Sequence, residues 1–393
     1  MLIGLVGKPN VGKSTFFKAA TLSEVLIANY PFATIKPNHG VGYVKVDCID
    51  KEFKTQCNPR HGFCINHQRF VPVDLMDVAG LVEGASEGKG LGNQFLDNLR
   101  EADAFIHIID VSGTTDKEGK IVENHDPSQD IEFLETELAL WYNNLLKKAW
   151  KVFTRKSEHE EINFSEAVAK QFSGLKIDEE QVKQVLRNLN FKEKPSQWSD
   201  EQILQFSRGL LHSSKPMILA LNKADHPNSQ NNIKKIKERF PHFLTIPCSA
   251  DSELALREAS KAGLIEYIPG ESNFKIIKEV NERQKQALKK IKENVLDKYG
   301  NTGVQQILNT VVFDLLKYLA IFPAGANKLA DSKGNILPDC FLMPEGSTAL
   351  DFAGKIHADF AKNFVKAIDA RSKKALGKEY KLKNRDALEI VAK

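Results

Sequence analysis

The segment that most constrains this chain is GKPNVGKS at residues 7–14, which matches the pattern G-x-x-x-x-G-K-[ST]. An apolar run, Leu2–Val6, precedes it, and a stretch of helical character, Ser14–Ala20, follows it. Glycines let such a loop wrap a phosphate with its backbone N–H groups pointing inward, and the helix N-terminus adds partial positive charge. The pattern therefore predicts a strand, a phosphate-binding loop and a helix, which begin an α/β domain of the P-loop NTPase type with a mostly parallel sheet.

Each residue type in this loop has an expected task. Lys13 is predicted to reach the β- and γ-phosphates and to act in catalysis, and the Ser14 hydroxyl is predicted to ligate Mg²⁺. The predicted nucleotide-binding residues of the segment are Gly7, Lys8, Pro9, Asn10, Val11, Gly12, Lys13, Ser14 and Thr15.

The tetrapeptide Asp77-Val78-Ala79-Gly80 follows a predicted strand, Phe70–Met76. Its carboxylate, Asp77, is expected to hold Mg²⁺ through a water molecule, and the Gly80 N–H is expected to meet the γ-phosphate during catalysis. Such a tetrapeptide is common in turns, but its place after an apolar strand and downstream of the phosphate loop makes it informative.

Two further segments predict which base is bound. Asn222-Lys223-Ala224-Asp225 follows the apolar run Met217–Leu221, and Ser249-Ala250 follows Phe243–Pro247. The Asp225 carboxylate can accept hydrogen bonds from N1–H and the exocyclic amine of guanine, a pairing that adenine cannot offer. Asn222 can brace the loop, the Lys223 stem can cover the ring, and Ser249 with the Ala250 N–H can approach guanine O6. The order of the four segments therefore predicts GTP as the ligand and substrate, with GDP as the product.

Two stretches resemble the switch segments of a GTP-binding protein. Asn29–Thr34 lies where a first switch belongs, and Thr34 is a candidate to bind Mg²⁺ and the γ-phosphate and to act in catalysis; it could also be an ordinary residue before a strand. Glu83–Gly92 carries four glycines and is expected to be mobile until the γ-phosphate orders it. The residue after Gly80 is Leu81, which cannot orient a water molecule, so slow intrinsic hydrolysis is expected.

The remaining pattern divides the chain into four parts. Residues 1–115 and 213–275 are predicted to form the nucleotide-binding domain, with further strands at Gly40–Val46 and Ala104–Ile109. Apolar residues recur every three to four positions from Ile131 to Val152, which predicts a helical insertion over residues 116–212. Residues 276–319 are expected to form two connecting helices. The first begins at Ile277, and the second is capped by Asn301 or Thr302 and runs through Tyr318. Residues 320–393 are predicted to form a small α+β domain with a helix at about 349–367.

Charge and cysteine content favour a cytoplasmic protein without a membrane partner. No run of eighteen apolar residues exists, and five cysteines scattered over 393 residues indicate reduced thiols. Residues 320–393 hold 13 Lys and Arg against 9 Asp and Glu. This basic end is compatible with RNA as a partner, or simply with a solvated surface. DNA is not expected as a partner.

Four potential metal ligands lie close together in the sequence, namely Cys57, His61, Cys64 and His67. Their spacing matches no standard zinc knuckle. A hairpin insertion over Asp47–Gln68 with free thiols is therefore the favoured interpretation, and zinc binding is the alternative.

With these residues in hand, the chain resembles the Obg-related GTPases of the TRAFAC class, specifically the YchF branch, over essentially its whole length. The resemblance rests on GKPNVGKSTFFKA, NYPFATIKPNHGVGYV and DVAGLVEGASEGKGLGNQFLDNLREAD, and on a tail similar to a TGS domain, a β-grasp fold. Many members carry a Glu in the base-recognition motif and prefer ATP, whereas Asp225 in NKAD predicts GTP and an archaeal-type subgroup. The usual Lys after Ser-Ala is replaced here by Asp251.

The resemblance implies work with the ribosome or RNA, with the TGS domain as the contacting module. It also implies that catalysis proceeds without the usual Gln, as Leu81 indicates. Several GTPases with the same PNVGKS loop use K⁺, so the resemblance makes the Asn10 carbonyl a candidate K⁺ ligand that would assist catalysis; alternatively, Asn10 only shapes the loop. Two rival functions remain open: hydrolysis of ATP, and an RNA- or ribosome-binding adaptor whose nucleotide site hardly turns over. A P-loop kinase fits poorly, because NKAD would have no role.

Overall fold

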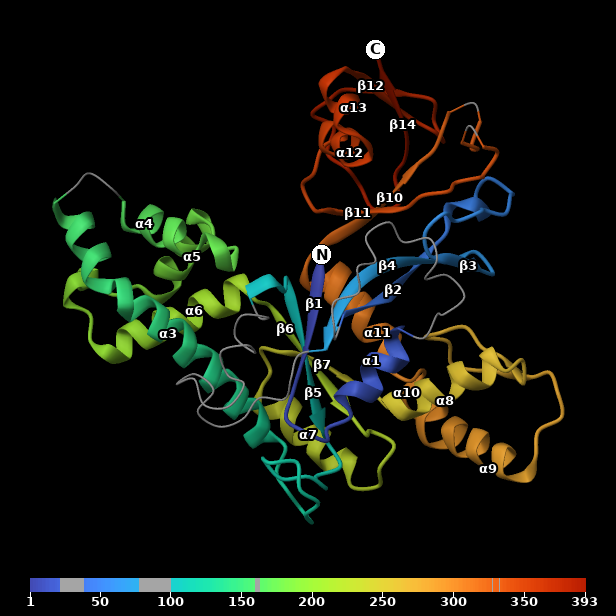
Figure 1. Cartoon of the computed structure of the whole chain (residues 1–393), viewed down its shortest axis with the longest axis horizontal. Helices are drawn as coiled ribbons and strands as arrows, with labels where there is room; N and C mark the ends of the chain where they lie inside the picture. The colour runs from blue at the N-terminus through green and yellow to red at the C-terminus, as the bar shows by residue number, and fades with distance from the viewer. Residues whose placement is uncertain (22–38, 78–99, 160–162, 327, 332) are drawn as a thin grey trace.

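The computed structural model describes residues 1–21, 39–77, 100–159, 163–326, 328–331 and 333–393. Within this part of the chain, the largest sheet has seven strands in the order β2-β4-β1-β5-β6-β7, with β3 beside β4 (Figure 1). Strands β4, β1, β5, β6 and β7 run parallel, and β2 and β3 pair antiparallel with β4. The bounds are β1 (Leu2–Val6), β2 (His39–Asp47), β3 (Phe63–Ile65), β4 (Gln68–Asp77), β5 (Ala104–Asp110), β6 (Met217–Asn222) and β7 (Leu244–Pro247). The predicted strands and the predicted β2–β4 hairpin are confirmed.

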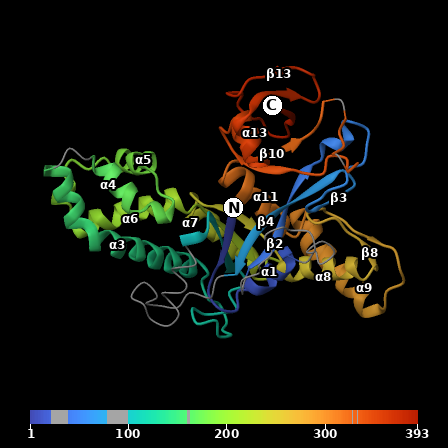
Figure 2. The same ribbon diagram turned by 45° about the horizontal axis from the view of Figure 1, so that its top comes forward.

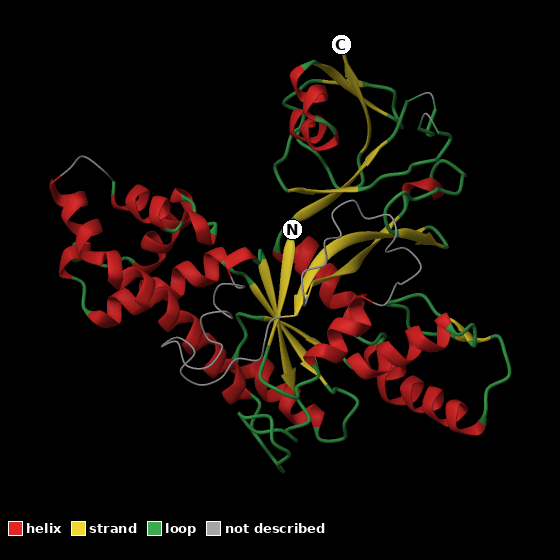
Figure 3. Cartoon of the chain, in the orientation of Figure 1, coloured by secondary structure: helices red, strands yellow, loops and turns green. Residues whose placement is uncertain are grey.

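Helices cover both faces of this sheet, which is consistent with the buried, mostly apolar sequences of its central parallel strands β1, β5 and β6 (Figure 3). In β5, Ile106 and Ile108 pack in one core with α1 (Lys13–Thr21) and α11 (Val304–Asn309). The alternate residue Phe105 packs in a second core with the helical insertion, and Ile109 packs with α7 (Ser229–Arg239). Every residue of β5 is buried. The sheet is therefore a rigid platform for the loops at its carboxyl edge.

The predicted helical insertion forms an arm that extends away from the sheet in Figure 1. It contains α3 (Ser128–His159), α4 (Phe164–Gln171), α5 (Glu179–Leu189) and α6 (Asp200–Ser214). Trp150, Phe164, Trp198 and Phe206 pack against one another at its centre, with ring centroids 5.3–6.4 Å apart. Aromatic contacts of this kind stabilise beyond the area they bury, and the same buried cluster continues to Phe105 of the sheet, which anchors the arm there.

The connecting segment differs from the prediction at three points. It contains α9 (Glu282–Ile291), a π-helix over Lys292–Leu296, α10 (Asp297–Tyr299), α11 and a second π-helix over Thr310–Leu315. Before it along the chain come α8 (Ala250–Lys261), β8 (Ile265–Glu266) and β9 (Lys275–Ile276). The first helix begins after Asn281, which caps it, and not at Ile277. Gly303, at φ +85°, precedes α11 in place of the predicted Asn301 or Thr302 cap. Tyr318 belongs to the following strand.

A five-stranded sheet within the described residues forms the C-terminal domain, in the order β11-β10-β14-β12-β13. Its elements are β10 (Tyr318–Pro323), β11 (Phe341–Pro344), α12 (Ala349–Ile356), α13 (Ala358–Lys362), β12 (Phe364–Asp369), β13 (Ala375–Leu376) and β14 (Ala387–Ala392). Phe352 of α12 packs on the sheet beside Ile321 and Leu388. The single predicted helix over 349–367 is wrong in length, because His357 adopts an extended backbone and a strand begins at Phe364.

The C-terminal domain lies against the insert between β2 and β4, as the turned view shows (Figure 2). Cys48, Ile49 and Cys57 of this insert share a buried cluster with Phe322 and Leu337. The guanidinium of Arg69, which is fully buried, donates to the backbone oxygens of Leu337 and Pro338 at 3.1 and 3.0 Å. None of the described helices is long and apolar enough to span a membrane.

Candidate nucleotide-binding site

A cleft of about 690 Å³ opens at the carboxyl edge of the large sheet. It lies between the loop after β1 and the loops after β6 and β7. Three separately predicted segments therefore meet at one place, as expected for an α/β sheet, where ligands bind beyond the carboxyl ends of the strands. The lining residues are Lys8, Pro9, Asn10, Gly12, Lys13, Ser14, Thr15, Asn222, Lys223, Asp225, His226, Ser249 and Asp251.

The loop after β1 needs glycine at position 12. Gly12 has φ +91°, a backbone conformation that residues with a Cβ rarely adopt. A Cβ there would lie 2.4 Å from the Asn222 side-chain nitrogen. The Phe16 N–H donates to the Gly12 oxygen at 2.8 Å, which starts helix α1 directly after the loop. The helix N-terminus thus opens into the cleft, where its partial positive charge favours an anion such as phosphate.

Lys13, Ser14 and Asp77 gather at one end of this site. The Lys13 ammonium is 2.5 Å from one Asp77 carboxylate oxygen, and the Ser14 hydroxyl is 3.2 Å from the other. Both charged side chains retain some exposure, 13% and 17%. A hydroxyl and a carboxylate oxygen side by side are the hard oxygen ligands that Mg²⁺ prefers, so the residues present fit a magnesium ion. Asp77 and Ser14 would hold it.

Asn222, at the end of β6, connects two loops through hydrogen bonds. Its side-chain nitrogen donates to the Val11 oxygen at 2.8 Å, and its side-chain oxygen accepts the Ala250 N–H at 3.0 Å. The Ala250 N–H is therefore bonded to Asn222 in this structure, whereas the sequence interpretation directs it toward guanine O6. Ser249 caps helix α8 by accepting from the Ser252 N–H. This bracing fixes the loops after β1, β6 and β7 relative to one another.

Asp110 was missed by the sequence interpretation and positions the Lys223 side chain. It ends β5 directly beside Asn222 in the parallel register, and its carboxylate is 2.7 Å from the Lys223 ammonium. Burial raises the pKa of Asp110, but hydrogen bonds from Lys223, Ser112 and Thr115 outweigh that effect and hold its pKa below the usual range. A signal was available, because Asp110 is a carboxylate at the carboxyl end of a predicted core strand.

The Asp225 carboxylate lies in the cleft and is exposed, so it is accessible to a ligand. His226 and Asp251 also line the cleft and were not among the predicted site residues. The cleft thus offers a cation and an oxygen-ligand pair at the phosphate loop, and a carboxylate at the loop after β6. This distribution of charge suits a nucleoside phosphate whose base carries hydrogen-bond donors.

The side chains of Lys8 and Asn10 point toward the start of the helical arm. The Lys8 ammonium is buried and contacts Asp130 at 2.8 Å and the Thr115 oxygen at 2.7 Å. Asn10 has φ +63°, and its side-chain nitrogen donates to the Gly119 oxygen at 2.9 Å. Asn tolerates such a left-handed backbone better than most residues. These contacts suit a loop-shaping role for Asn10, and within the described part of the chain no hydrogen bond engages its side-chain oxygen.

Several predicted residues lie outside the described part of the chain. They are Thr34 with the first switch segment, and Gly80, Leu81 and Glu83–Gly92 of the second.

The fold and the cleft together define a P-loop GTPase domain, and comparisons with protein families agree. Residues 2–139 match the model of the 50S ribosome-binding GTPase. Residues 220–325 match the G4 motif-containing domain of YGR210-like Obg-like GTPases, and residues 330–392 match the TGS domain.

Individual proteins extend the likeness to the full chain. An uncharacterized GTP-binding protein of Methanocaldococcus jannaschii is 47% identical, over 100% of this chain and 99% of that protein. The crystal structure of a GTP binding protein from Pyrococcus horikoshii is similar with a TM-score of 0.78 and 40% identity, covering all of both chains. The ribosome-binding ATPase YchF of Bacillus subtilis is 29% identical, over 93% of this chain and 87% of that protein. The chain belongs to the Obg-like GTPase family, in its YchF branch.

Proposed function

We propose that this chain is a Mg²⁺-dependent GTPase that alternates between GTP- and GDP-bound states and acts on the ribosome or RNA in the cytoplasm. The observation that carries this proposal is the cleft itself. It holds Lys13, Ser14 and Thr15 of the phosphate loop and the exposed Asp225 carboxylate in one cavity. The four-part division of the chain belongs to the same proposal, with residues 1–115 and 213–275 binding the nucleotide and residues 320–393 binding the partner.

Asp225 favours guanine over adenine. A carboxylate accepts two hydrogen bonds from the N1–H and the exocyclic amine of guanine, whereas the corresponding edge of adenine carries no such pair of donors. Hydrolysis of ATP is the second candidate, because the Bacillus subtilis relative is named an ATPase. The two candidates differ only in the base, so they predict opposite outcomes in competition between GTP and ATP.

In the proposed reaction, a water molecule attacks the γ-phosphorus, the bond to the β-phosphate oxygen breaks, and its electron pair leaves with GDP. The Lys13 ammonium and the N–H groups of residues 12–15 would stabilise the negative charge that develops. Bound Mg²⁺ would supply neutralisation of the phosphate charge, held by Ser14 and Asp77. Thr34 and Gly80 are proposed to complete the site around the γ-phosphate. Leu81 lacks a donor or acceptor, so slow intrinsic turnover is part of the proposal.

The C-terminal domain offers a basic and partly apolar surface for an RNA partner. Lys362 and Lys366 are exposed at the end of α13 and in β12, and Phe360 and Val365 beside them are 38% and 47% exposed. Lysines neutralise phosphates, and exposed aromatic rings can stack on unpaired bases. The ribosome-binding name of the Bacillus subtilis relative supports the same assignment.

The proposal predicts that purified ribosomes accelerate GTP turnover more than ATP turnover. Charge reversal at Lys362 and Lys366 should weaken ribosome association about tenfold or more at low salt and remove the acceleration. The rate without ribosomes should stay the same. Turnover assays with each nucleotide, with and without ribosomes, measure this. Reversal of Lys289 and Lys290, exposed on α9, is the matched control.

Three results of these assays would contradict the proposal. Faster turnover of ATP than GTP would favour the ATPase candidate. Negligible turnover of both nucleotides with ribosomes present would favour a binding adaptor. Association that is independent of salt, or unaffected by reversal at Lys362 and Lys366, would remove the C-terminal domain from the contact.

We further propose that K⁺ assists hydrolysis through the Asn10 side-chain oxygen. Its amide nitrogen is already committed to Gly119, so the oxygen is the atom left for a cation. A monovalent cation beside the phosphates would add positive charge where negative charge develops. GTP turnover should therefore be faster in K⁺ than in Na⁺ at equal ionic strength, and Asn10→Ala should lose this difference. Equal rates in the two salts would leave Asn10 with its loop-shaping role alone.

A further inference from the structure

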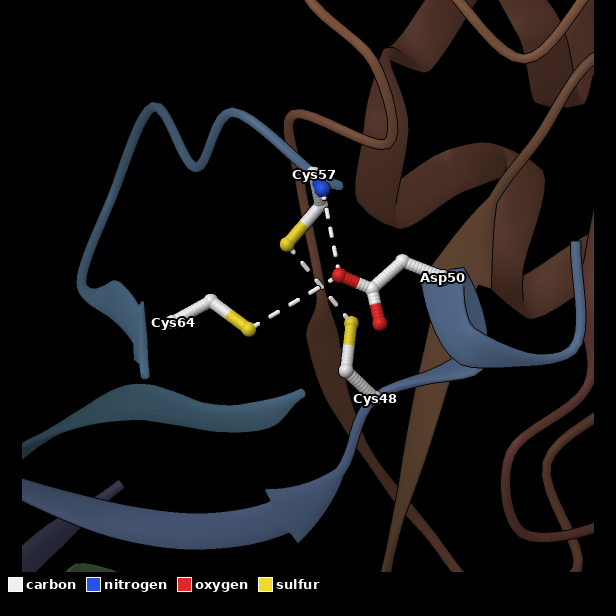
Figure 4. Close-up of side chains that lie close together, drawn as sticks. All are labelled: Cys48, Asp50, Cys57 and Cys64. Carbon is white, nitrogen blue, oxygen red and sulfur yellow. Dashed lines mark hydrogen bonds between the residues drawn. The ribbon is translucent and has the colours of Figure 1, made fainter. Parts of the chain in front are cut away.

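Three cysteines and one aspartate converge between the nucleotide-binding domain and the C-terminal domain. Cys48 follows β2, and Asp50 lies in a single 3-10 turn (Ile49–Lys51). Cys57 lies in the loop between this turn and β3, and Cys64 lies in β3 itself. Their three sulfur atoms and one carboxylate oxygen all lie within 4.8 Å of one another. Figure 4 shows the four side chains pointing toward a common centre. No other group of three or more His, Cys, Asp or Glu side chains is so arranged among the residues that the structure describes.

The distances fit four ligands around a tetrahedral metal ion. Zinc–sulfur bonds of about 2.3 Å place two sulfur ligands of a tetrahedron about 3.8 Å apart, and a sulfur and an oxygen ligand about 3.5 Å apart. The Cys48 and Cys57 sulfur atoms are 3.7 Å apart, and the Cys64 sulfur is 3.9 Å from an Asp50 oxygen. A disulfide would require a sulfur separation of about 2.05 Å. The cluster is therefore spaced for a shared ion and not for a covalent bond.

The surroundings hold these ligands in place. The Asp50 carboxylate is fully buried, and one of its oxygens is 2.9 Å from His67 Nδ1. The other oxygen faces the sulfurs and accepts the Cys57 N–H at 3.1 Å. Partners of this kind orient metal-binding carboxylates in proteins.

This arrangement revises the ligand set considered from the sequence. Cys57 and Cys64 belong to the cluster, but its other two members are Cys48 and Asp50. His67 contacts Asp50 and not the centre, and His61 is outside the four. Thiolate ligands select zinc, copper(I) or iron–sulfur clusters, and a closed set of four single ligands with one carboxylate oxygen suits Zn²⁺ among these.

We propose that Cys48, Asp50, Cys57 and Cys64 bind one structural Zn²⁺ ion, which fixes the insert between β2 and β4 against the C-terminal domain. The loop that carries Cys57 also makes the contacts to that domain. Asn58 and Arg60 donate their backbone N–H groups to the oxygens of Ile336 and Pro338, both at 2.8 Å. An ion that fixes this loop would therefore also fix those contacts between domains.

The test is the zinc content of the full-length protein, purified under reducing conditions without chelators. About one zinc ion per chain is expected in the wild type, and removal of one ligand should lower zinc affinity by at least about 10- to 100-fold. Cys57→Ser and Cys64→Ser should therefore lose the ion. Two controls should keep it: Cys340→Ser, a cysteine of the same interface, and His61→Gln, a member of the set considered from the sequence.

A spectroscopic measurement on the wild type keeps the proposal testable if the variants fold poorly. Co²⁺ added to the chelator-treated protein should give thiolate-to-cobalt charge-transfer bands and the visible bands of tetrahedral Co²⁺, and Zn²⁺ should displace them. Three outcomes would overturn the proposal. They are absence of zinc after incubation with equimolar Zn²⁺ under reducing conditions, equal zinc in Cys57→Ser and wild type, and a Cys48–Cys57 disulfide in protein that was never exposed to oxidant.

Discussion

Asp225→Asn should lower GTP affinity by about 30- to 800-fold, which corresponds to about 2–4 kcal/mol. The carboxylate lies exposed in the cleft, where it can accept both donors of the guanine edge. The amide that replaces it keeps one acceptor and presents an N–H group to the guanine amine, so one good hydrogen bond becomes a clash of donors. Equilibrium binding of a fluorescent GTP analogue, with competition by ATP, measures the loss.

Xanthosine triphosphate provides the sharpest control for this variant. Its 2-oxo group replaces the guanine amine, so the new amide can donate to it, and Asp225→Asn should prefer xanthosine triphosphate to GTP. Asp251→Asn, which changes another carboxylate of the same cleft, should cost less GTP affinity than Asp225→Asn. Unchanged GTP affinity in Asp225→Asn, or equal wild-type affinity for GTP and ATP, would refute base recognition by Asp225.

Lys13→Ala should lower kcat for GTP by about 10²- to 10³-fold, the range found when one preorganised charge-stabilising donor is removed. In this structure the Lys13 ammonium pairs with Asp77 at the magnesium end of the site, so it is placed among the groups that would surround the phosphates. Single-turnover rates and GTP affinity should be measured together. A fall in kcat larger than the fall in affinity indicates stabilisation of the transition state. A kcat within a few-fold of the wild type would exclude this role.

The parts of the fold and site that the sequence predicted are those governed by local pattern. The apolar runs before Gly7, Asp77 and Asn222 predicted the strands, and the short motifs after them predicted which loops meet at the cleft. Such motifs can be recognised in a sequence because a phosphate loop and a base-binding loop each need particular residues within a few positions.

Contacts between distant segments were not predictable in the same way. Lys223 pairs with Asp110, 113 positions earlier, because β5 and β6 are neighbours in the sheet. Cys48 joins Cys57 and Cys64 because β2 and β3 flank the start of β4 on its two edges, whereas the sequence grouped Cys57 and Cys64 with two nearby histidines, and only as the alternative to free thiols. The predicted helix ends were wrong where the backbone leaves the helical conformation, as at His357, whose backbone is extended.

The buried Lys8–Asp130 pair makes the phosphate loop the anchor of the helical arm, because Asp130 lies in the first turn of α3. Removing one partner of a buried ion pair costs about 3–5 kcal/mol, because the charge left behind is uncompensated. A ligand that moves the arm must therefore either keep Lys8 and Asp130 paired, and so move the phosphate loop as well, or provide other partners or water for both charges. By thermodynamic reciprocity, whatever factor such a ligand imposes on GTP affinity, GTP imposes on the ligand. The position of the arm and the binding of the nucleotide are therefore coupled in both directions.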